Sequence, residues 1–305
     1  MKKILAIQGS DLDRINIKTD TTILLAAEAQ KRGYKIYYFE PENLSFLNGK
    51  VIAICKYIKI NGSKKKFYSI IKTINFNLEK SKIVLIRNDP PFDNRYLYTT
   101  FLLNYIAKKV KIINHPFAVR NVSEKLFSIN FMRYMPPTLI SENLKEIRNF
   151  FKLHKAVVAK PINGFSGNNV ILLKSFKSTK IKKMLKTHKH LFFQKFLPGI
   201  SKGDKRVFII KGKIVGAISR VPKKGSILSN MSKGAKAKLT ILTSKEIKAS
   251  KVIGKLLLKN KIYFAGIDFV QEQLIGDINV TSPTGLAAYK SLSNINLAKT
   301  FWNNV

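Results

Sequence analysis

The sequence predicts a mixed fold of two kinds: an open α/β sheet in the first third of the chain and an α+β assembly in the rest. In the first third, short apolar runs of strand type alternate with amphipathic helical runs, which is the pattern of a mostly parallel sheet. After Pro116, strand-like runs pair as hairpins, which is typical of antiparallel structure. The chain has 305 residues, 45% of them hydrophobic, which is enough for two or three domains with buried cores.

The first third is expected to contain two helices and a hairpin within its strands. A helix at 20–33 has Asp20 as its candidate amino-terminal cap. The dipeptide Asn48-Gly49 lies between two apolar runs, which predicts a tight hairpin. A second helix is expected at 94–109. The strands are expected at 2–8, 34–40, both arms of the hairpin within 44–54, 82–87 and 110–114.

The remainder is expected to be richer in hairpins. A Gly/Ser/Lys-rich loop at 223–238 separates a hairpin at 205–222 from a long amphipathic helix. Helices are expected at 123–132, 144–154, 180–188 and 244–260, with a short one at the end of the chain. Further strands are expected at 156–161, 169–174, 191–198, 263–270 and 273–280.

The formal net charge of +39 raises the question of nucleic-acid binding. Of the 56 basic residues, 47 are lysines spread along the chain, whereas arginine is the residue preferred for base and phosphate forks. We therefore expect no specific nucleic-acid partner.

No apolar run approaches a membrane span or a secretory signal, and the single cysteine, Cys55, excludes an intramolecular disulfide. A cytoplasmic protein is expected.

Acidic and amide side chains occur on two apolar strand-like runs near the end of the chain. Asp277 and Asn279 lie two residues apart, so they share one face of a strand, and Asp268 lies on the preceding strand. Carboxylate and amide oxygens suit Mg²⁺, which is commonly completed by substrate phosphates. A polar strand end with a turn acid after Gly276 is the alternative reading, and these residues alone do not decide between the two.

A glycine-containing loop and a basic hairpin add anion-binding chemistry. Lys160 ends an apolar strand and is followed by Gly164 and Gly167, whose backbone amides could surround a phosphate, although a plain hairpin loop explains the same pattern. Arg206 and Arg220 lie on the two arms of the 205–222 hairpin. Cationic side chains opposite each other across a hairpin repel unless an anion lies between them, so an anionic substrate is expected there.

Motifs along nearly the whole chain resemble those of prokaryotic glutathione synthetase, a family of the ATP-grasp superfamily. They are NIKTDTT, EAQKRGY, IRNDPPFD, VSEKLF, KPINGFSG, GDKRVFII, SRVP and DINVTSPT. The resemblance implies an ATP-grasp fold with a preceding open, mostly parallel α/β domain at 1–120, a central lid domain at 121–197 and a C-terminal ATP-grasp domain at 198–305. It also implies homo-oligomers.

The resemblance implies ligation of γ-glutamylcysteine to glycine, with ATP as co-substrate and Mg²⁺, or alternatively Mn²⁺, as metal. An acyl phosphate forms first, and ADP and phosphate are released. Arg206 and Arg220 are the implied catalytic residues, and Asp268, Asp277 and Asn279 the implied metal ligands. The implied nucleotide contacts are Lys125, Lys160, Gly164, Ser166, Gly167, Gln194, Lys195, Phe196, Leu197 and Asp204. The implied substrate contacts are Asn16, Lys18, Arg87, Asp89, Ser282 and Pro283.

The loop after SRVP departs from the family pattern. Leu228 and Lys236 stand where arginines are expected, and Ser229 replaces one of several glycines. Asp277 stands where the family usually has Glu, one methylene longer. These departures keep two alternatives open: an ATP-grasp ligase that joins a different acid–amine pair, and a basic nucleic-acid-binding protein without enzymatic activity.

Overall fold

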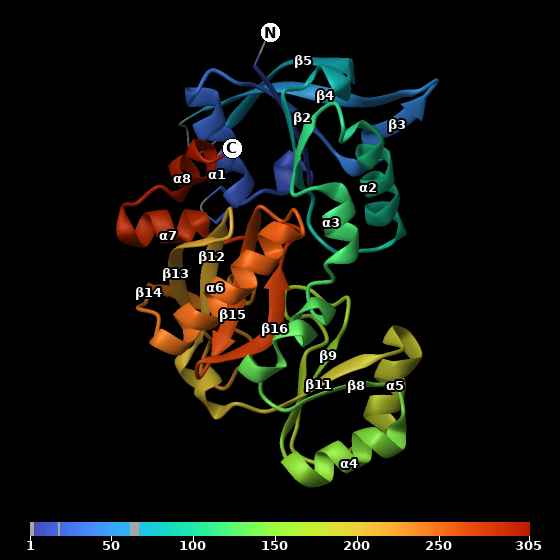
Figure 1. The fold of residues 1–305 in the computed structure, drawn as a ribbon, viewed down its shortest axis with the longest axis vertical. Helices are drawn as coiled ribbons and strands as arrows, with labels where there is room; N and C mark the ends of the chain where they lie inside the picture. Colours follow the sequence, from blue (N-terminus) through green and yellow to red (C-terminus); the bar gives the residue numbers. More distant parts are fainter. Residues whose placement is uncertain (1–2, 18, 62–66) are drawn as a thin grey trace.

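The computed structural model describes residues 3–17, 19–61 and 67–305, and its strands form three sheets that follow one another along the chain. The first sheet and the second sheet occupy opposite ends of the molecule, and the third, built from the last part of the chain, lies between them (Figure 1). The sequence order and the spatial order of the sheets therefore differ, and the last sheet is the one placed to meet both others.

The first sheet has a parallel centre with antiparallel additions. Its order is β3-β4-β2-β1-β6-β7, with β5 paired to β4. The strands β2, β1, β6 and β7 run parallel, as expected, and the Asn48-Gly49 turn joins β3 to β4. β5 was not expected, because most of its central side chains are exposed and carry no clear apolar alternation. The strands are β1 (Ile4–Gly9), β2 (Lys35–Phe39), β3 (Leu44–Leu47), β4 (Lys50–Ile60), β5 (Tyr68–Asn77), β6 (Ile83–Arg87) and β7 (Lys111–Ile113).

Helix α1 packs on this first sheet, and the helices at the end of the chain pack on α1 and on β13 of the third sheet described below. The predicted cap of α1 is present, because the Asp20 carboxylate accepts a hydrogen bond of 2.6 Å from the Ile23 amide. The end of the chain returns to α1, and the Trp302 indole donates to the Leu25 carbonyl at 2.8 Å. The helices are α1 (Thr21–Lys31), α2 (Asn94–Ile106), α3 (Pro116–Asn121), α7 (Leu286–Ser293) and α8 (Leu297–Asn303). Within the described ranges, no helix has the length and apolar character needed to cross a bilayer.

The second sheet is antiparallel, has the order β10-β9-β11-β8 and has a core of its own. Ile147 and Phe151 of α4 pack with Val157, Ala159 and Phe193 in that core. The segment therefore has the packing of a separate body. Its elements are β8 (Thr138–Ser141), α4 (Leu144–His154), β9 (Val157–Pro161), β10 (Ile171–Leu173), α5 (Ser178–His188) and β11 (Leu191–Lys195).

The third sheet is also antiparallel, with the order β14-β13-β12-β15-β16. The helix α6 covers it and begins with a capping box formed by Thr243 and Glu246. The predicted loop at 223–238 is partly ordered, because its last residues form β14. The elements are β12 (Asp204–Ile210), β13 (Lys213–Val221), β14 (Lys236–Leu239), α6 (Ser244–Lys259), β15 (Phe264–Val270) and β16 (Gln273–Asn279).

The helix expected at 123–132 is instead a set of 3₁₀ turns at Leu126–Tyr134, interrupted at Phe131. The Ser128 hydroxyl donates to the Lys125 carbonyl, and the Asn130 amide donates to the Phe127 carbonyl. Such side-chain bonds compete with the regular α-helical pattern. The tight turns hold Lys125 next to the third sheet, where it enters the site described below.

Candidate active site

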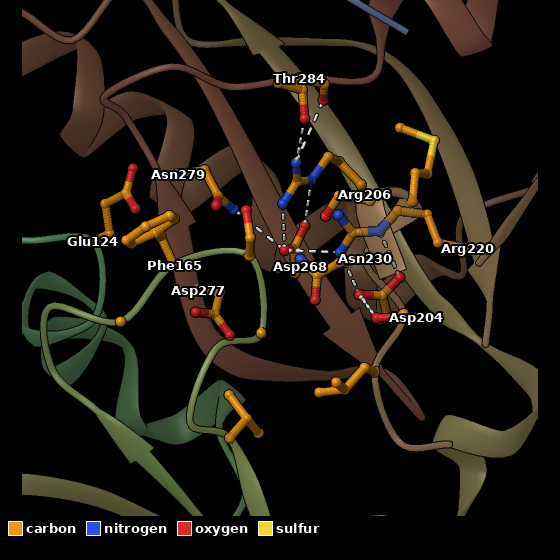
Figure 2. Close-up of a pocket in the computed structure, with 18 of the residues that line it drawn as sticks. Glu124, Phe165, Asp204, Arg206, Arg220, Asn230, Asp268, Asp277, Asn279 and Thr284 are labelled. Carbon is orange, nitrogen blue, oxygen red and sulfur yellow. Dashed lines mark hydrogen bonds and ion pairs between the residues drawn. The ribbon is translucent and has the colours of Figure 1, made fainter. Parts of the chain in front are cut away.

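A cavity of about 820 Å³ lies where the three parts of the chain meet. Its wall comes from the loop after β1, from β9, β11 and the loop after β9, and from the third sheet. Its size is that of a site for a cofactor or a large substrate. Figure 2 shows acidic and basic side chains from several strands converging in it.

Two arginines hold Asp268 at the centre of the cavity wall (Figure 2). Arg206 of β12 donates to both carboxylate oxygens of Asp268, at 2.8 and 2.7 Å, and Arg220 of β13 approaches the same carboxylate at 2.9 Å. The Asp268 side chain is only 5% exposed. Burial acts to raise the pKa of Asp268, but the two guanidinium groups outweigh it and hold the pKa well below its usual range. Asp268 is therefore expected to be ionised at neutral pH.

Asp204 extends this network by one step. Its carboxylate receives both the Nε and an Nη of Arg220, in the bidentate geometry that favours Arg–carboxylate pairs. Ser229, from the loop after β13, donates to the same carboxylate at 2.6 Å. Burial raises the pKa of Asp204 in spite of the favourable charge of Arg220, and the nearby Asp268 raises it further. Lys205, between the two network residues in sequence, points to the other face of β12 and binds Glu246.

Two lysines hold Asp277 more loosely than the arginines hold Asp268. The Lys160 ammonium lies 3.2 Å from one carboxylate oxygen, and the Lys125 ammonium lies 3.5 Å from the other. The Asp277 side chain is 24% exposed toward the cavity. Desolvation acts to raise the pKa of Asp277, and the two lysines reverse this effect and lower it. The carboxylate is thus ionised and accessible.

The three predicted metal ligands converge. The Asn279 amide donates to Asp268 at 3.2 Å, and Asp277 lies two residues before Asn279 on β16. All three side chains line the cavity. Among the described residues, no group of three or more His, Cys, Asp or Glu side chains gathers to hold a metal by itself. Two carboxylates and one amide oxygen fit Mg²⁺, which takes oxygen ligands and is commonly completed by water and substrate phosphates.

The loop after β9, residues 162–169, covers the lysines from one side. The Lys125 ammonium donates to the Gly164 carbonyl at 2.6 Å. Gly167 has φ +72°, and a Cβ atom there would lie 2.7 Å from the Asn230 side-chain oxygen. A larger residue would therefore push this loop away from the loop that follows β13. Gly164, Ser166 and Gly167 all line the cavity, together with Lys125 and Lys160.

The segment predicted to meet adenine, 194–197, forms another part of the wall. The Gln194 side chain is buried, accepts from Lys160 at 3.2 Å and donates to Thr138 at 3.0 Å. The backbone amides of Lys195 and Phe196 donate to the carbonyls of Pro137 and Ala156. Because these two amides already have partners, a hydrogen bond from this segment to adenine would come from its other backbone groups.

The predicted substrate contacts divide into two sets. Asn16, Asp89 and Ser282 line the cavity. Arg87 and Pro283 do not line it: the buried Arg87 guanidinium donates to the Pro283 carbonyl at 3.0 Å and braces the loop that carries Ser282. Lys18 lies outside the described residues.

Two residues that sequence reasoning did not single out also support the site. The Glu124 carboxylate accepts hydrogen bonds from the amides of Val280 and Thr281, at 2.8 and 3.0 Å, and so fixes the chain directly after the metal-type strand. Thr284 contacts Arg206 at 3.4 Å. Glu124 directly precedes Lys125, and the scarcity of acids in this chain, 17 in all, is the signal that could have drawn attention to it.

Comparisons with known proteins agree with this geometry. Residues 3–120 match the family described as "Prokaryotic glutathione synthetase, N-terminal domain", and residues 124–294 match "Prokaryotic glutathione synthetase, ATP-grasp domain". The chain is 36% identical over 309 residues to a protein named glutathione synthetase from Bradyrhizobium diazoefficiens, covering 100% of this chain and 98% of that protein. It is 31% identical over 286 residues to the protein of the same name from Escherichia coli O157:H7, covering 92% and 90% of the two chains.

Solved structures support the fold at lower sequence identity. The D-cycloserine synthetase DcsG superposes with a TM-score of 0.67 at 12% identity, covering 98% of this chain and 99% of that one. The ATP-grasp ligase PsnB, solved with a minimal precursor, superposes with a TM-score of 0.65 at 16% identity, covering 100% and 97%. These likenesses establish the ATP-grasp fold predicted from the sequence. With both family domains matched over nearly its full length, the chain belongs to the prokaryotic glutathione synthetase family.

Proposed function

We propose that this protein is an ATP-dependent ligase that forms glutathione from γ-glutamylcysteine and glycine and releases ADP and phosphate. The observation that carries the proposal is a set of ion pairs inside the cavity. Each carboxylate that we expect to bind the metal is paired with basic side chains that we expect to bind phosphate. Lys125 and Lys160 hold Asp277, and Arg206 and Arg220 hold Asp268. Membership of the family over both of its domains supports the choice of reaction.

The pairing suits a site that takes up a cation and a polyanion together. A metal alone would meet carboxylates already neutralised by lysine and arginine, and a triphosphate alone would meet cations already neutralised by acid. When both enter, the acids gain the metal and the cations gain the phosphates, so that no buried charge is left without a partner. The carboxylates on these apolar strands are therefore paired with lysine or arginine in the empty site and with the metal in the occupied site.

The residue assignments follow from this exchange. Asp268, Asp277 and Asn279 would hold Mg²⁺, or Mn²⁺ with the same oxygen ligands, and such a metal would screen the charge of the phosphates. Lys125 and Lys160 bind phosphate oxygens, the loop of Gly164, Ser166 and Gly167 covers them, and Gln194, Lys195, Phe196 and Leu197 border the adenine. Asp204 acts through Arg220, because its carboxylate is bonded to that guanidinium and to Ser229.

The reaction proceeds in two steps. The cysteinyl carboxylate of the dipeptide attacks the γ-phosphorus of ATP, which gives an acyl phosphate and ADP. The glycine amine then attacks the acyl carbon, the phosphate leaves with the electrons of the C–O bond, and the amine loses a proton. Arg206 and Arg220 lie where they can balance the charge that develops on the transferring phosphoryl group and on the acyl oxygen. Asn16, Asp89 and Ser282 line the cavity, and we assign the binding of the dipeptide to them.

A ligase for a different acid–amine pair is a second candidate, favoured by one observation. Leu228 lines the cavity at a position where an arginine is expected from the family pattern, so this wall offers an apolar surface and no cation. Such a ligase would use the same nucleotide machinery with other substrates.

One assay separates these functions. Purified protein is given Mg-ATP and its phosphate release is measured with γ-glutamylcysteine and glycine together, with each alone, and with other dipeptide and amine pairs. We expect release that requires both named substrates and equals the glutathione formed. Release with other pairs but none with this one would replace the proposal by the second candidate, and no nucleotide binding with or without Mg²⁺ would remove both.

We also propose that the protein works in the cytoplasm as a homo-oligomer. Its one cysteine is a free, buried thiol, as expected for a reducing compartment. Copies with a net charge of +39 repel one another, so we expect them to meet through an apolar face that carries few charges. The helix α2 contains no lysine and exposes Tyr98, Phe101 and Tyr105 by 60, 55 and 54%. Sedimentation of the parent and of Phe101→Glu tests whether this face joins the copies.

A further inference from the structure

The loop between β13 and β14, residues 222–235, lies over the cavity and is called the lid here. Five of its residues line the cavity beside Ser229: Ile227, Leu228, Asn230, Met231 and Ser232. Six lid residues are exposed, among them Lys223, Lys224 and Lys233, and only Pro222 and Ser229 are buried. The lid therefore needs an anchor to stay over the site.

Ser229 is the point where the lid is anchored. It is 7% exposed, and every other residue from 223 to 240 is half-buried or exposed. Its hydroxyl donates to the Asp204 carboxylate at 2.6 Å. By contrast, the hydroxyl of Ser226, three residues earlier, makes a local turn by accepting from the Leu228 amide at 3.0 Å. Only the first of these bonds joins the lid to the third sheet.

The acceptor of that bond is part of the reaction-centre network. Asp204 holds Arg220 by two hydrogen bonds, and Arg220 in turn contacts Asp268 at 2.9 Å. A carboxylate oxygen shared between a lid hydroxyl and an arginine couples the position of the lid to the position of that guanidinium. When the lid opens, Asp204 loses a donor and water gains access to the buried face of Arg220.

We propose that Ser229 is the latch of the lid and a positioning residue for Arg220, holding the lid shut while the acyl phosphate exists. This inference rests on the proposed ligase function. With the lid shut, the acyl carbon is available to the glycine amine and shielded from water. With the lid open, water attacks the acyl phosphate and returns the unchanged dipeptide and phosphate, so the net reaction is ATP and water to ADP and phosphate.

The first test is the ratio of phosphate released to glutathione formed. The parent has a ratio near one. Ser229→Ala removes the hydroxyl that binds a charged acceptor, which shifts the balance between shut and open lid about tenfold, and the ratio rises clearly above one. Ser226→Ala is the matched control, since it removes a hydroxyl from the same loop that does not reach Asp204, and its ratio stays with the parent. Ser229→Thr keeps the hydroxyl and restores a ratio near one.

The second test reads the lid without any ligation. Trypsin cleavage after Lys223, Lys224 and Lys233 is followed by mass spectrometry with the non-hydrolysable ATP analogue AMPPNP and Mg²⁺ present. We expect about tenfold faster cleavage in Ser229→Ala than in the parent and in Ser226→Ala. Parental values in both tests, or a change in only one of them, overturn the latch. A parent that forms no glutathione overturns the proposed function, while the cleavage test still decides whether Ser229 holds the lid.

Discussion

Two carboxylates in one cavity are held in opposite ways. Asp268 is buried, and two arginines grip it at 2.7 to 2.9 Å, one of them through both carboxylate oxygens. Asp277 is 24% exposed, and two lysines approach it at 3.2 and 3.5 Å, one to each oxygen. Planar guanidinium groups fix a carboxylate in direction as well as charge, whereas an ammonium on a flexible stem is a point charge that can leave.

This difference divides the site into two parts. The first is the arginine network of Asp204, Arg206, Arg220 and Asp268, called the frame here, and the second is the exchangeable pair of lysines around Asp277. The arginine network is made of strand residues whose neighbours are fixed by the β12–β13 and β12–β15 registers, in which Asp204 lies opposite Arg220 and Arg206 opposite Asp268. The lysine pair comes from the second part of the chain and from the turns that lead into it. We infer that nucleotide binding rearranges the lysines around Asp277 more than it rearranges the arginines around Asp268.

The largest effect is expected from Asp268→Asn. The substitution leaves Arg206 and Arg220 buried with one fewer negative charge, and removing one member of a buried ion pair costs about 3–5 kcal/mol of unfolding free energy. Glutathione formation should fall by about 100-fold or more, because both reaction-centre arginines lose their orientation. Urea unfolding and the ligation assay measure the two effects. A variant with parental stability would contradict the view of Asp268 as part of a frame.

Asp277→Asn is expected to separate binding from stability. Asp277 itself is 24% exposed, although Lys125 and Lys160 are buried, so we expect the unfolding free energy to fall by less than in Asp268→Asn. Affinity for Mg-ATP should fall by about ten- to hundredfold, because a charged oxygen ligand is lost. Titration calorimetry with and without Mg²⁺ checks this, and Asp268→Asn measured in parallel is the comparison. If Asp277→Asn destabilised the protein as much as Asp268→Asn, the two acids would not differ in role.

The two halves of this comparison differed in how well the sequence predicted them. Strand periodicity placed Asp277 and Asn279 on one face, and the family resemblance, through motifs that include GDKRVFII, SRVP and DINVTSPT, implied that Arg206, Arg220 and the metal ligands belong to one site. The ion pairs themselves were not predicted, because the partners of Asp277 come from residues 117 and 152 positions earlier, and only the packing of separate sheets brings them together. Periodicity within a strand carries no information about which sheet packs against it.

Arg87 and Ser229 show the same limit at single residues. Arg87 was predicted to contact substrate because the IRNDPPFD motif resembles that of the family, but its guanidinium is turned into the protein toward Thr22 and Pro283. Ser229 was noted only as a replaced glycine, since a serine in a Gly/Ser/Lys-rich loop has no distinctive spacing. Its burial against Asp204 depends on the path of the whole lid.

The pH dependence is expected to affect activity before stability. Burial raises the pKa of Asp204, so it takes up a proton above the ordinary aspartate range of about 4 and releases its hold on Arg220. Because the pKa of Asp204 is higher in the folded form, the folded form binds this proton more tightly than the unfolded chain does. Protonation of Asp204 therefore increases the unfolding free energy as the pH falls. Asp268 and Asp277 have lowered pKa values, and their contribution is lost only when the pH falls below the ordinary range.

The measurement compares kcat/KM with thermal unfolding between pH 7 and pH 5. As the pH is lowered, we expect kcat/KM to begin to fall before Tm does, because protonation of Asp204 weakens its hold on Arg220, whereas Asp268 and Asp277 lose their charge only at lower pH. Ser229→Ala removes a donor that favours the charged form of Asp204, so its acid limb should move to higher pH. A parallel loss of Tm and kcat/KM would place the titrating group elsewhere in the frame.

The smallest effect is expected from Glu124→Gln. This substitution tests whether β16, the strand of Asp277 and Asn279, needs the hydrogen bonds of Glu124 to hold its end in place. The Glu124 carboxylate accepts from the amides of Val280 and Thr281 and from the Thr281 hydroxyl. Glutamine keeps one acceptor oxygen but loses the charge, so we expect a loss of about 1 kcal/mol of unfolding free energy. Asn279 lies directly before these bonds, so the Mg²⁺ concentration for half-maximal activity should rise a few-fold with kcat little changed. Lys109→Gln, which breaks an exposed pair with Glu79, is the control that should alter neither quantity. An unchanged Mg²⁺ requirement in Glu124→Gln would mean that β16 holds Asn279 in place without help from the second part of the chain.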